Sequence, residues 1–367
     1  MTLHIFNPEH DIALAYDNKY FTAPHAGRLL RHDLDYLPVL WAAEGDYVLV
    51  ENIGSAKQHA LRFQRFGKQV NFVNRNDVER LSEYIDNVSP WGWDAALKFQ
   101  LEQMGVKTAV LPTDKELADI RKLSNRQFSS AVLEDVQTQL ANPILLGKAF
   151  YVDCFADLES MLQMIGKAVI KAPWSSSGRG VRYVDSILEP ALANWAKNVI
   201  KMQGGIMIEP YYNKVKDFGV EFYSDAEGVH YVGLSVFHTV NGAYLGNSLA
   251  DEVEKKSILS TYISEGLLKD VIISLEQLLT SQLRGVYRGP LGVDMMIVAA
   301  EKGFMLHPVV EINLRRTMGH VALSLSSRHE LSDRIMRIDY DGAHYHLHLV
   351  HKAQVQHRTA IPSAGVA

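Results

Sequence analysis

The sequence predicts an α/β domain over residues 1–115, followed by a region in which apolar strands pair into hairpins. The first prediction comes from short apolar strands that alternate with helical patterns. The second comes from two apolar runs that flank a short polar stretch near residue 300. Residues 331–353 also alternate and predict a strand hairpin, whereas residues 354–367 are expected to form a disordered tail.

The composition predicts a soluble, cytoplasmic protein. The chain has 367 residues, of which 47% are hydrophobic, so it can build two or three domain cores. A net charge of −5 gives no reason to expect nucleic acid as a partner. Cys154 is the only cysteine, so no internal disulfide can form, and residues 1–10 lack the regions of a signal peptide. No run approaches the roughly 18 apolar residues of a membrane helix, so no membrane partner is expected, while a homodimer stays open.

Short apolar runs predict five strands in the first domain, and two helical patterns follow them. The strands are expected at residues 3–6, 37–40, 47–50, 70–73 and 109–111, and the helices begin near Asn76 and Asp94. Asp94 is a candidate helix N-cap.

Two segments of this domain carry unusual side chains. Glu9, His10 and Asp11 follow the first strand at its carboxyl end, where ligands bind in open α/β sheets. They could bind substrate or metal, but sequence neighbours rarely converge on one ion, so turn and cap roles are favoured. Trp91 and Trp93 could wall a pocket, although packing between domains is favoured.

A lysine at the end of a predicted strand runs into a loop of hydroxyls and glycines. Val169 and Ile170 predict a core strand, where a lysine is rarely buried alone, so Lys171 is expected to face an anion. The loop offers donors that suit a polyphosphate, from Ser175, Ser176, Ser177, Gly178, Arg179 and Gly180. Taken alone, such a stretch is more often an ordinary surface loop, so the prediction needs support from elsewhere.

The support lies in the runs at residues 292–298 and 304–314, which predict a β-hairpin. A two-residue loop at Lys302 and Gly303 would place Asp294 opposite Glu311. The apolar neighbours on both strands would point into a core; these are Val293, Met295, Val310 and Ile312. Because opposed like charges destabilise a sheet, a divalent cation is expected to neutralise the pair.

The second strand of this hairpin adds further polar groups to the same face. Glu311, Asn313 and Arg315 alternate, which gives oxygen ligands suited to magnesium and a guanidinium suited to an anionic substrate. A solvated polar face is the alternative. Pro308 could introduce a bulge that changes the register, and a slip of one residue would separate the carboxylates.

Two more strands supply candidate nucleotide contacts. Glu209 ends an apolar strand that Pro210 stops, and it could accept a hydrogen bond from an exocyclic amine. Tyr211 or Tyr212 could lie against an adenine ring, and plain packing is equally open for either. Glu221 lies in the next alternating strand and is a candidate for a ribose hydroxyl or for the metal shell.

In this order, the candidate residues resemble the ATP-grasp superfamily of ATP-dependent ligases over residues 115–330. The set is Lys171, the Ser/Gly loop, Glu209, Glu221, Asp294, Glu311 and Asn313. The resemblance implies a nucleotide clamped between two α+β subdomains over residues 116–330, with the lid subdomain at about 145–210. It also implies that an N-terminal α/β domain lends part of the acceptor site.

The resemblance further implies a role for each residue. Lys171 would contact phosphate or adenine and Glu209 the adenine side, while Mg²⁺, or Mn²⁺ in its place, would be held by Asp294, Glu311 and Asn313. Arg126 stands where such proteins often carry a phosphate-binding lysine. This is a departure from the pattern, but an arginine keeps the charge and its fork suits phosphate.

A helix is expected to begin at Thr317, beside Arg315 and Arg316, with Gly319 in its first turn. A helix N-terminus beside two arginines predicts an anion pocket for a substrate carboxylate, although these arginines could merely pair with surface acids.

The predicted reaction is the joining of a carboxylate to an amine through an acyl phosphate. Arg315 would steady the oxyanion, and Lys171 and Arg179 would stabilise phosphate charge. A small-molecule kinase and a non-catalytic nucleotide-binding protein are the alternatives. In the tail, His344, His346 and His348 share one side of a strand and could chelate a metal, but a solvated face is favoured.

Overall fold

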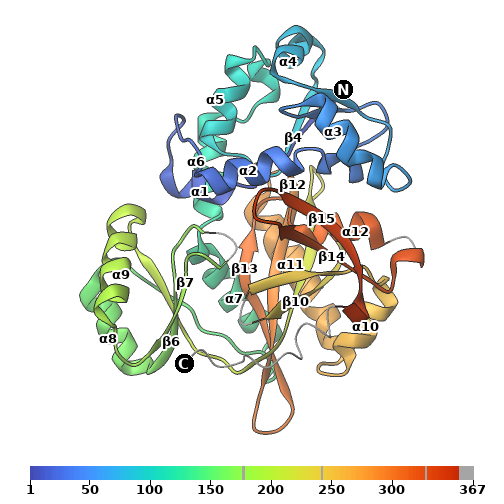
Figure 1. Ribbon diagram of the computed structural model, residues 1–367. Coiled ribbons are helices and arrows are strands. Elements are labelled where there is room, and N and C mark those ends of the chain that lie inside the picture. Colours follow the sequence, from blue (N-terminus) through green and yellow to red (C-terminus); the bar gives the residue numbers. More distant parts are fainter. Residues whose placement is uncertain (176–177, 241–242, 327–328, 355–367) are drawn as a thin grey trace.

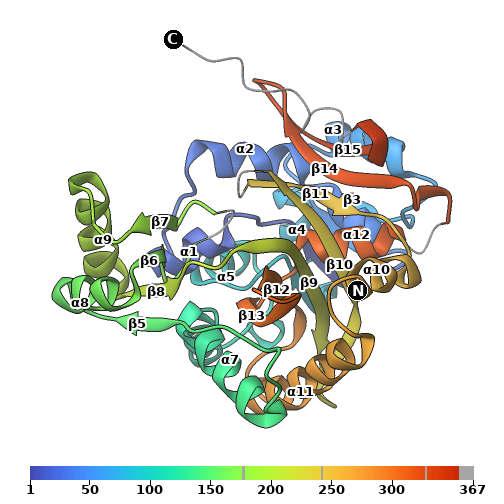
Figure 2. The ribbon, with the colours of Figure 1, turned by 90° about the horizontal axis from the view of Figure 1, so that it is seen from below.

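The computed structural model describes residues 1–175, 178–240, 243–326 and 329–354. Within them, three sheets form the framework of the molecule. A parallel sheet lies in the N-terminal part, a seven-stranded antiparallel sheet occupies the centre, and a smaller antiparallel sheet stands to one side (Figure 1). Seen from below, the small sheet with its two helices projects away from the rest of the chain (Figure 2).

The N-terminal sheet is parallel, with strand order β3-β2-β1-β4. Its strands are β1 (Thr2–Ile5), β2 (Tyr47–Leu49), β3 (Asn71–Val73) and β4 (Asn87–Pro90). Its helices are α1 (His10–Tyr16), α2 (His25–Leu34), α3 (Ile53–Ala60), α4 (Arg75–Leu81) and α5 (Ala95–Gln103). Asp94 caps α5 as predicted, because its Oδ1 accepts a hydrogen bond from the Leu97 N–H at 2.9 Å.

Two predicted strands of this domain are wrong, and one strand was missed. Residues 37–40 form a 3₁₀ helix, η1 (Leu37–Leu40), in which Pro38 fixes a helical φ near the start and all four side chains are buried. Residues 109–111 fall largely within a second 3₁₀ helix, η4 (Thr108–Val110). The missed strand is β4, whose Asn, Ser and Pro residues carry no apolar run.

The central sheet has strand order β13-β12-β9-β10-β11-β14-β15. Its strands are β9 (Lys214–Ser224), β10 (Val229–Val240), β11 (Ala243–Ser248), β12 (Gly289–Ala299), β13 (Phe304–Asn313), β14 (Arg334–Tyr340) and β15 (Tyr345–His351). The associated helices are α6 (Asp114–Leu123), α7 (Arg126–Leu140), α10 (Glu252–Ser260), α11 (Glu265–Leu283) and α12 (Met318–Ser326). Apolar residues of α7 and α11 pack with Phe218, Val220, Val293 and Leu306 of the sheet into the largest core. The opposite face, next to α12, carries the polar side chains.

The β12–β13 hairpin pairs Asp294 with Glu311 as predicted, but through a different path. The loop is longer than expected, because Ala299 pairs with Phe304. A bulge then shifts the register between Asp294 and Met296, in the stretch of β13 that contains Pro308. The longer loop and the bulge shift the register in opposite directions, so Asp294 still pairs with Glu311. The bulge also puts Val309 into the core, where Val310 was expected.

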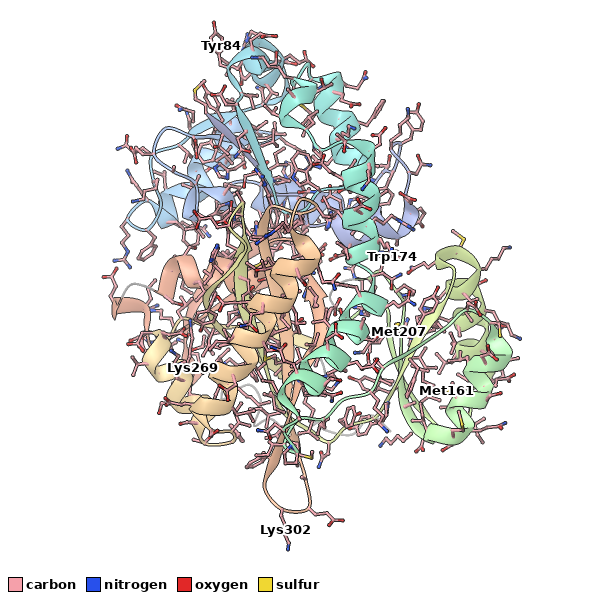
Figure 3. All side chains as sticks on the ribbon, turned by 180° about the vertical axis from the view of Figure 1, so that it is seen from behind. Tyr84, Met161, Trp174, Met207, Lys269 and Lys302 are labelled. Atoms are coloured by element: carbon pink, nitrogen blue, oxygen red, sulfur yellow. The ribbon has the colours of Figure 1, made fainter. Side chains whose placement is uncertain are left out.

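The small sheet has strand order β5-β8-β6-β7 and is backed by two helices. Its elements are β5 (Phe150–Val152), α8 (Phe155–Ile165), β6 (Lys167–Lys171), β7 (Val181–Asp185), α9 (Pro190–Gln203) and β8 (Ile206–Pro210). The loop after β6 contacts the rest of the chain through Trp174 (Figure 3). The indole N–H of Trp174 donates to the Arg121 carbonyl at 2.9 Å. The Arg121 guanidinium lies 4.0 Å from the centre of the Trp174 ring.

The C-terminal hairpin, β14 and β15, forms as predicted and extends the central sheet, because β14 pairs with β11. It also packs on the N-terminal part. Met336 and Leu347 share a core with Leu37 of η1, and the Tyr345 N–H donates to Asp33 at 2.7 Å. The hairpin therefore joins the central sheet to α2.

The predicted row of tail histidines lies along β15 with ring-to-ring distances of 6.5 Å and 5.9 Å. Two of the three rings have acidic partners. His344 Nδ1 lies 2.9 Å from Asp33 Oδ1, and His346 Nε2 lies 2.8 Å from Asp341 Oδ2. The rings are thus held by separate carboxylates, which fits a structural role better than one shared ion.

Among the described residues, no helix has both the length and the apolar character needed to cross a membrane.

Candidate active site

The candidate site forms where the polar face of β12 and β13 meets the first residue of α7 and the ends of β6 and β8. The chain brings these five elements together from positions as far apart as Arg126 and Glu311. Strand alternation puts Asp294 and Glu311 on this face, because Val293 and Ile312 occupy the opposite face in the core.

Asp294 is a partly buried acid of this face. Burial, together with the charges of Glu311 and Glu221, raises the pKa of its carboxyl to about 8, while Arg315 opposes the shift. The Asn313 amide donates to Asp294 Oδ2 at 3.3 Å. The face therefore gathers more negative charge than its neighbours offset, and its oxygen donors fit a hard divalent cation.

Arg126 links this acidic face to the loop between β6 and β7, which contains Ser175 and is called the lid loop below. Its Nη2 donates to Glu311 Oε1 at 2.7 Å, and its Nη1 donates to the Ala172 carbonyl at 2.5 Å and to Ser175 Oγ at 2.7 Å. The buried Nε has no partner among the described residues. A cation held by Glu311 would share this carboxylate with Arg126, so one guanidinium would connect the cation to the loop at Ser175.

Lys171 and Glu209 form a buried ion pair, with Nζ 2.7 Å from Oε2 and both side chains 9% exposed. They lie on adjacent strands, because β6 and β8 pair antiparallel and set Lys171 opposite Met207. The sequence predicted that Lys171 faces an anion, and in this structure that anion is the Glu209 carboxylate. Because so little solvent surrounds this pair, removal of either side chain would leave an uncompensated buried charge.

The rest of the lid loop is more open. Gly180 lies so close to Ser175 that a Cβ built on it would be 2.2 Å from Ser175 Oγ, so only glycine fits there. Gly178 adopts φ 72°, and it and Arg179 are exposed. Arg179 has no ion pair among the described residues, whereas Ser176 and Ser177 lie outside them.

Arg315 is brought to this face as predicted, and its main partner comes from the N-terminal domain. Its Nε donates to both oxygens of Asp11, at 3.0 and 2.9 Å, and its Nη2 donates to Asn313 Oδ1 at 2.8 Å. For Asp11 the sequence favoured a turn or cap role over binding of substrate or metal, and it did not predict a pairing with Arg315. No spacing in the sequence relates it to Arg315, so this contact could not have been found without the fold.

Arg316 does not join Arg315, contrary to the predicted anion pocket. Its guanidinium lies 4.5 Å from the centre of the Trp41 ring. Thr317 Oγ1 accepts from the His320 N–H at 3.3 Å, at the place where the helix was predicted to begin.

Glu221 is buried beneath α12 rather than open to a ribose. Thr317 Oγ1 donates to its Oε2 at 2.8 Å, and His320 Nδ1 lies 3.0 Å from the same oxygen. Two glycines make room for it. A Cβ on Gly319 would lie 1.8 Å from Oε1, and one on Gly292 would lie 2.6 Å from Oε2. The carboxylate thus fixes the start of α12 against the sheet.

The tyrosines after β8 separate. Tyr211 is 41% exposed and lies against Tyr183 and the Lys167 ammonium, whereas Tyr212 stacks edge-on against His307 at 5.7 Å. His307 was missed by the sequence analysis, since it sits in an apolar run. Neither of its ring nitrogens has a partner among the described residues, and burial, with Lys171 nearby, lowers its pKa to about 3.

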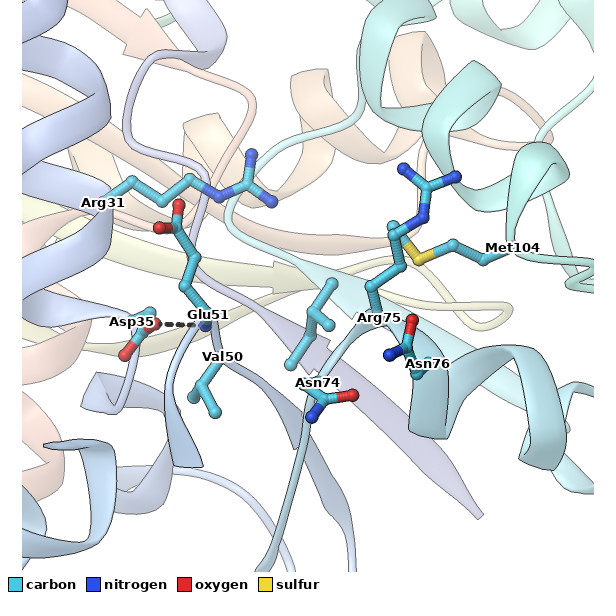
Figure 4. Close-up of a pocket in the computed structure, with 9 residues that line it drawn as sticks. Arg31, Asp35, Val50, Glu51, Asn74, Arg75, Asn76 and Met104 are labelled. Atoms are coloured by element: carbon cyan, nitrogen blue, oxygen red, sulfur yellow. Dashed lines mark hydrogen bonds between the residues drawn. The ribbon is translucent and has the colours of Figure 1, made fainter. Parts of the chain in front are cut away.

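The N-terminal domain contributes a separate groove at the carboxyl edge of its sheet. A cavity of about 390 Å³ lies between Arg31 and Arg75, with Asp35, Glu51 and Asn74 on its wall (Figure 4). Its charges are already partly paired, because Arg31 Nη1 donates to Glu9 Oε1 at 2.8 Å.

Glu9, His10 and Asp11 diverge to three partners instead of converging on one ion, but the favoured cap role is not seen, because the Glu9 side chain makes no cap hydrogen bond at the start of α1. Glu9 pairs with Arg31, His10 Nδ1 lies 3.4 Å from Asp94, and Asp11 holds Arg315. Trp91 is buried against Phe6 with ring centres 5.0 Å apart, in agreement with the favoured packing role.

Asp35 in this groove gives a pH-dependent prediction. Burial raises its pKa to about 7, which the hydrogen bond from the Glu51 N–H offsets only in part. The folded protein therefore binds one more proton than the unfolded chain between about pH 4 and 7, so the free energy of unfolding falls as pH rises through that window. Asp35→Asn cannot ionise and keeps the acceptor. We expect it to exceed the wild type in stability by up to about 4 kcal/mol at pH 8 and by little near pH 4.

Urea unfolding of both proteins across this range checks the prediction, with Asp153→Asn at an exposed position as the control. A stability difference that does not change with pH would show that the Asp35 carboxyl ionises normally in the folded state.

No family model matches the sequence, and no curated protein matches it. Solved structures do match the fold. N5-carboxyaminoimidazole synthetase from Staphylococcus aureus, complexed with ADP, has 11% identity and a TM-score of 0.51, over 93% of this chain and 83% of that one. A biotin carboxylase–β,γ-ATP complex from Campylobacter jejuni has 13% identity and a TM-score of 0.50, over 89% and 71%. Both are ATP-grasp enzymes, so the predicted resemblance is confirmed for the fold.

Proposed function

Since this chain has the ATP-grasp fold, we propose that it is an ATP- and magnesium-dependent ligase that joins a carboxylate to an amine through an acyl phosphate. One observation carries the proposal. The paired acids Asp294 and Glu311 lie on one face, and Arg126 donates both to Glu311 and to Ser175 Oγ of the neighbouring loop. Acids that call for a cation and donors that suit phosphate therefore meet at one place.

The nucleotide is assigned to the place where the ends of β6 and β8 meet the β12–β13 face. Lys171 and Arg126 supply positive charge for the phosphates, and Glu209 can accept from an exocyclic amine once Lys171 turns to a phosphate. The loop from Ser175 to Gly180 covers the phosphates, and Arg179 swings in from its exposed position. We leave Glu221 and Tyr211 out of the nucleotide site, because Glu221 is engaged by α12 and Tyr211 faces Lys167.

The cation is assigned to Asp294, Glu311 and Asn313. Magnesium, or manganese in its place, would offset the charge that develops on the phosphate oxygens. The residues themselves fit this cation, because they offer carboxylate and amide oxygens on one rigid hairpin and because burial leaves Asp294 without a full counter-charge.

The reaction then proceeds in two displacements. A substrate carboxylate oxygen attacks the γ-phosphorus and ADP leaves; the amine nitrogen next attacks the acyl carbon, phosphate leaves, and the nitrogen loses a proton. Arg315, oriented by Asp11, steadies the carboxylate and the later oxyanion. Lys171 and Arg179 stabilise phosphate charge, and the closed loop keeps water from the acyl phosphate.

Release of ADP and phosphate tests this function, with magnesium and pools of amino acids, small peptides and metabolite carboxylates. We expect phosphate release to require both a carboxylate and an amine, and mass spectrometry to detect the amide. A phosphorylated product that accumulates in place of the amide would overturn the ligase in favour of a small-molecule kinase. Tight ATP binding without turnover in any pool would favour a non-catalytic nucleotide-binding protein.

A further inference from the structure

A second cavity, of about 530 Å³, lies beside α12 and is lined mostly by carbon. Its apolar walls include Trp41 after η1, Tyr223 and Pro290 at the paired ends of β9 and β12, and Leu323 of α12, while α10 contributes Asp251, Glu252 and Lys255. This volume and this lining are typical of sites for small organic molecules.

One wall of the cavity carries a buried lysine that forms no ion pair with a described residue. Lys255 of α10 is 1% exposed, and its ammonium has one hydrogen bond, to Ser326 Oγ at 3.3 Å. No carboxylate of a described residue lies within 4 Å of that ammonium. A buried lysine without an acidic partner costs stability, so its presence in a cavity wall calls for an explanation.

The acids around Lys255 are engaged with other groups. Glu252 accepts from the Tyr231 hydroxyl and from the Leu234 N–H at 3.1 Å, and Asp251 caps α10 by accepting from the Glu254 N–H at 2.8 Å. Glu254 pairs with Lys352 at 2.5 Å. The cavity therefore presents a positive charge whose neighbouring carboxylates already have donors.

A second guanidinium reaches the same cavity. Arg316 lies over the face of Trp41 at 4.5 Å, and its buried Nε has no partner among the described residues. Flat aromatic surface with two cations at its edge suits a molecule with an apolar body and an anionic group.

We propose that this cavity binds an organic carboxylate with an aromatic or branched apolar body, whose carboxylate pairs with Lys255 and Arg316 while the body packs between Trp41 and Tyr223. The site is separate from the proposed nucleotide site. Pro290 and Asp294 share one face of β12 but lie four residues apart, about 13 Å along the strand. Binding is measured without ATP, so the proposal stands or falls independently of the ligase activity.

The test compares phenylacetate and indole-3-acetate with the neutral phenylacetamide by isothermal titration calorimetry on the full chain. We expect at least one carboxylate to bind with a dissociation constant of about 1 mM or lower, and phenylacetamide to bind at least about tenfold more weakly than phenylacetate. Equal binding of acid and amide, or no saturable binding of either acid, would overturn the proposal.

Lys255→Met supplies the matched variant, with Lys269→Met on the outer side of α11 as the control (Figure 3). The change at Lys255 should weaken carboxylate binding about tenfold or more and raise the melting temperature by about 2 °C, because it removes a buried charge. The control should change neither. If Lys255→Met keeps the carboxylate affinity of the wild type, Lys255 is not a ligand contact and the assignment is wrong. Arg316→Gln provides the same binding test should Lys255→Met not fold.

Discussion

Glu311→Gln is expected to abolish the magnesium dependence of ATP binding and to lower any ATP turnover by at least about 100-fold. The side chain keeps its size and can still accept the Arg126 hydrogen bond, which is 2.7 Å long in the wild type. What it loses is the charge that faces Asp294 across the hairpin. The fold should therefore persist while the cation site loses one of its two carboxylates.

The measurement is calorimetric titration of ATP with and without magnesium, followed by phosphate release in the pool that gives turnover. Glu301→Gln is the matched control, because Glu301 is exposed at the tip of the same hairpin, next to Lys302 (Figure 3). Its titrations should equal those of the wild type. Unchanged magnesium-dependent binding in Glu311→Gln would remove Glu311 from the metal site and leave the acidic face as a structural feature.

The pairing of Asp294 with Glu311 shows what strand alternation can predict. The period of two puts every second residue on the same face, and the core residues Val293 and Ile312 fix which face that is. The loop length was mispredicted, and the bulge near Pro308 compensated for it. Burial of one face of the sheet is a stronger constraint on strand pairing than the length of the turn. The two carboxylates therefore pair although the turn differs from the predicted one.

The contacts that the sequence did not predict depend on long-range packing. Asp11 meets Arg315 because the N-terminal domain docks on the central sheet, and Trp41 meets Arg316 for the same reason. Neither pair has a spacing or a periodicity that a single sequence carries. Lys255 is a similar case, since the packing of α10 on the central sheet buries this side chain and no pattern in the sequence predicted it.

The buried pair of Lys171 and Glu209 provides the second large effect. Lys171→Met leaves the Glu209 carboxylate buried at 9% exposure without its partner at 2.7 Å, so we expect a loss of about 3–5 kcal/mol in the unfolding free energy of the lid. Lys171→Met with Glu209→Leu replaces both charges by apolar groups and should recover most of that loss. If Lys171 holds phosphate and Glu209 holds the adenine amine, both variants should bind ATP at least about tenfold more weakly than the wild type.

Urea unfolding and hydrogen exchange of the β6 and β8 amides give the stabilities, and calorimetry gives the ATP affinities. Lys167→Met is the matched control, because Lys167 begins the same strand but is exposed. Within the described residues, its ammonium has no ion pair and lies 4.2 Å from the centre of the Tyr211 ring. The double variant separates the two roles of the pair. A stable double variant that binds ATP as tightly as the wild type would mean that the ion pair merely supports the lid, and the nucleotide would then have to bind elsewhere. A stable double variant without ATP affinity would instead tie the nucleotide to these two side chains, because loss of folding could no longer explain loss of binding.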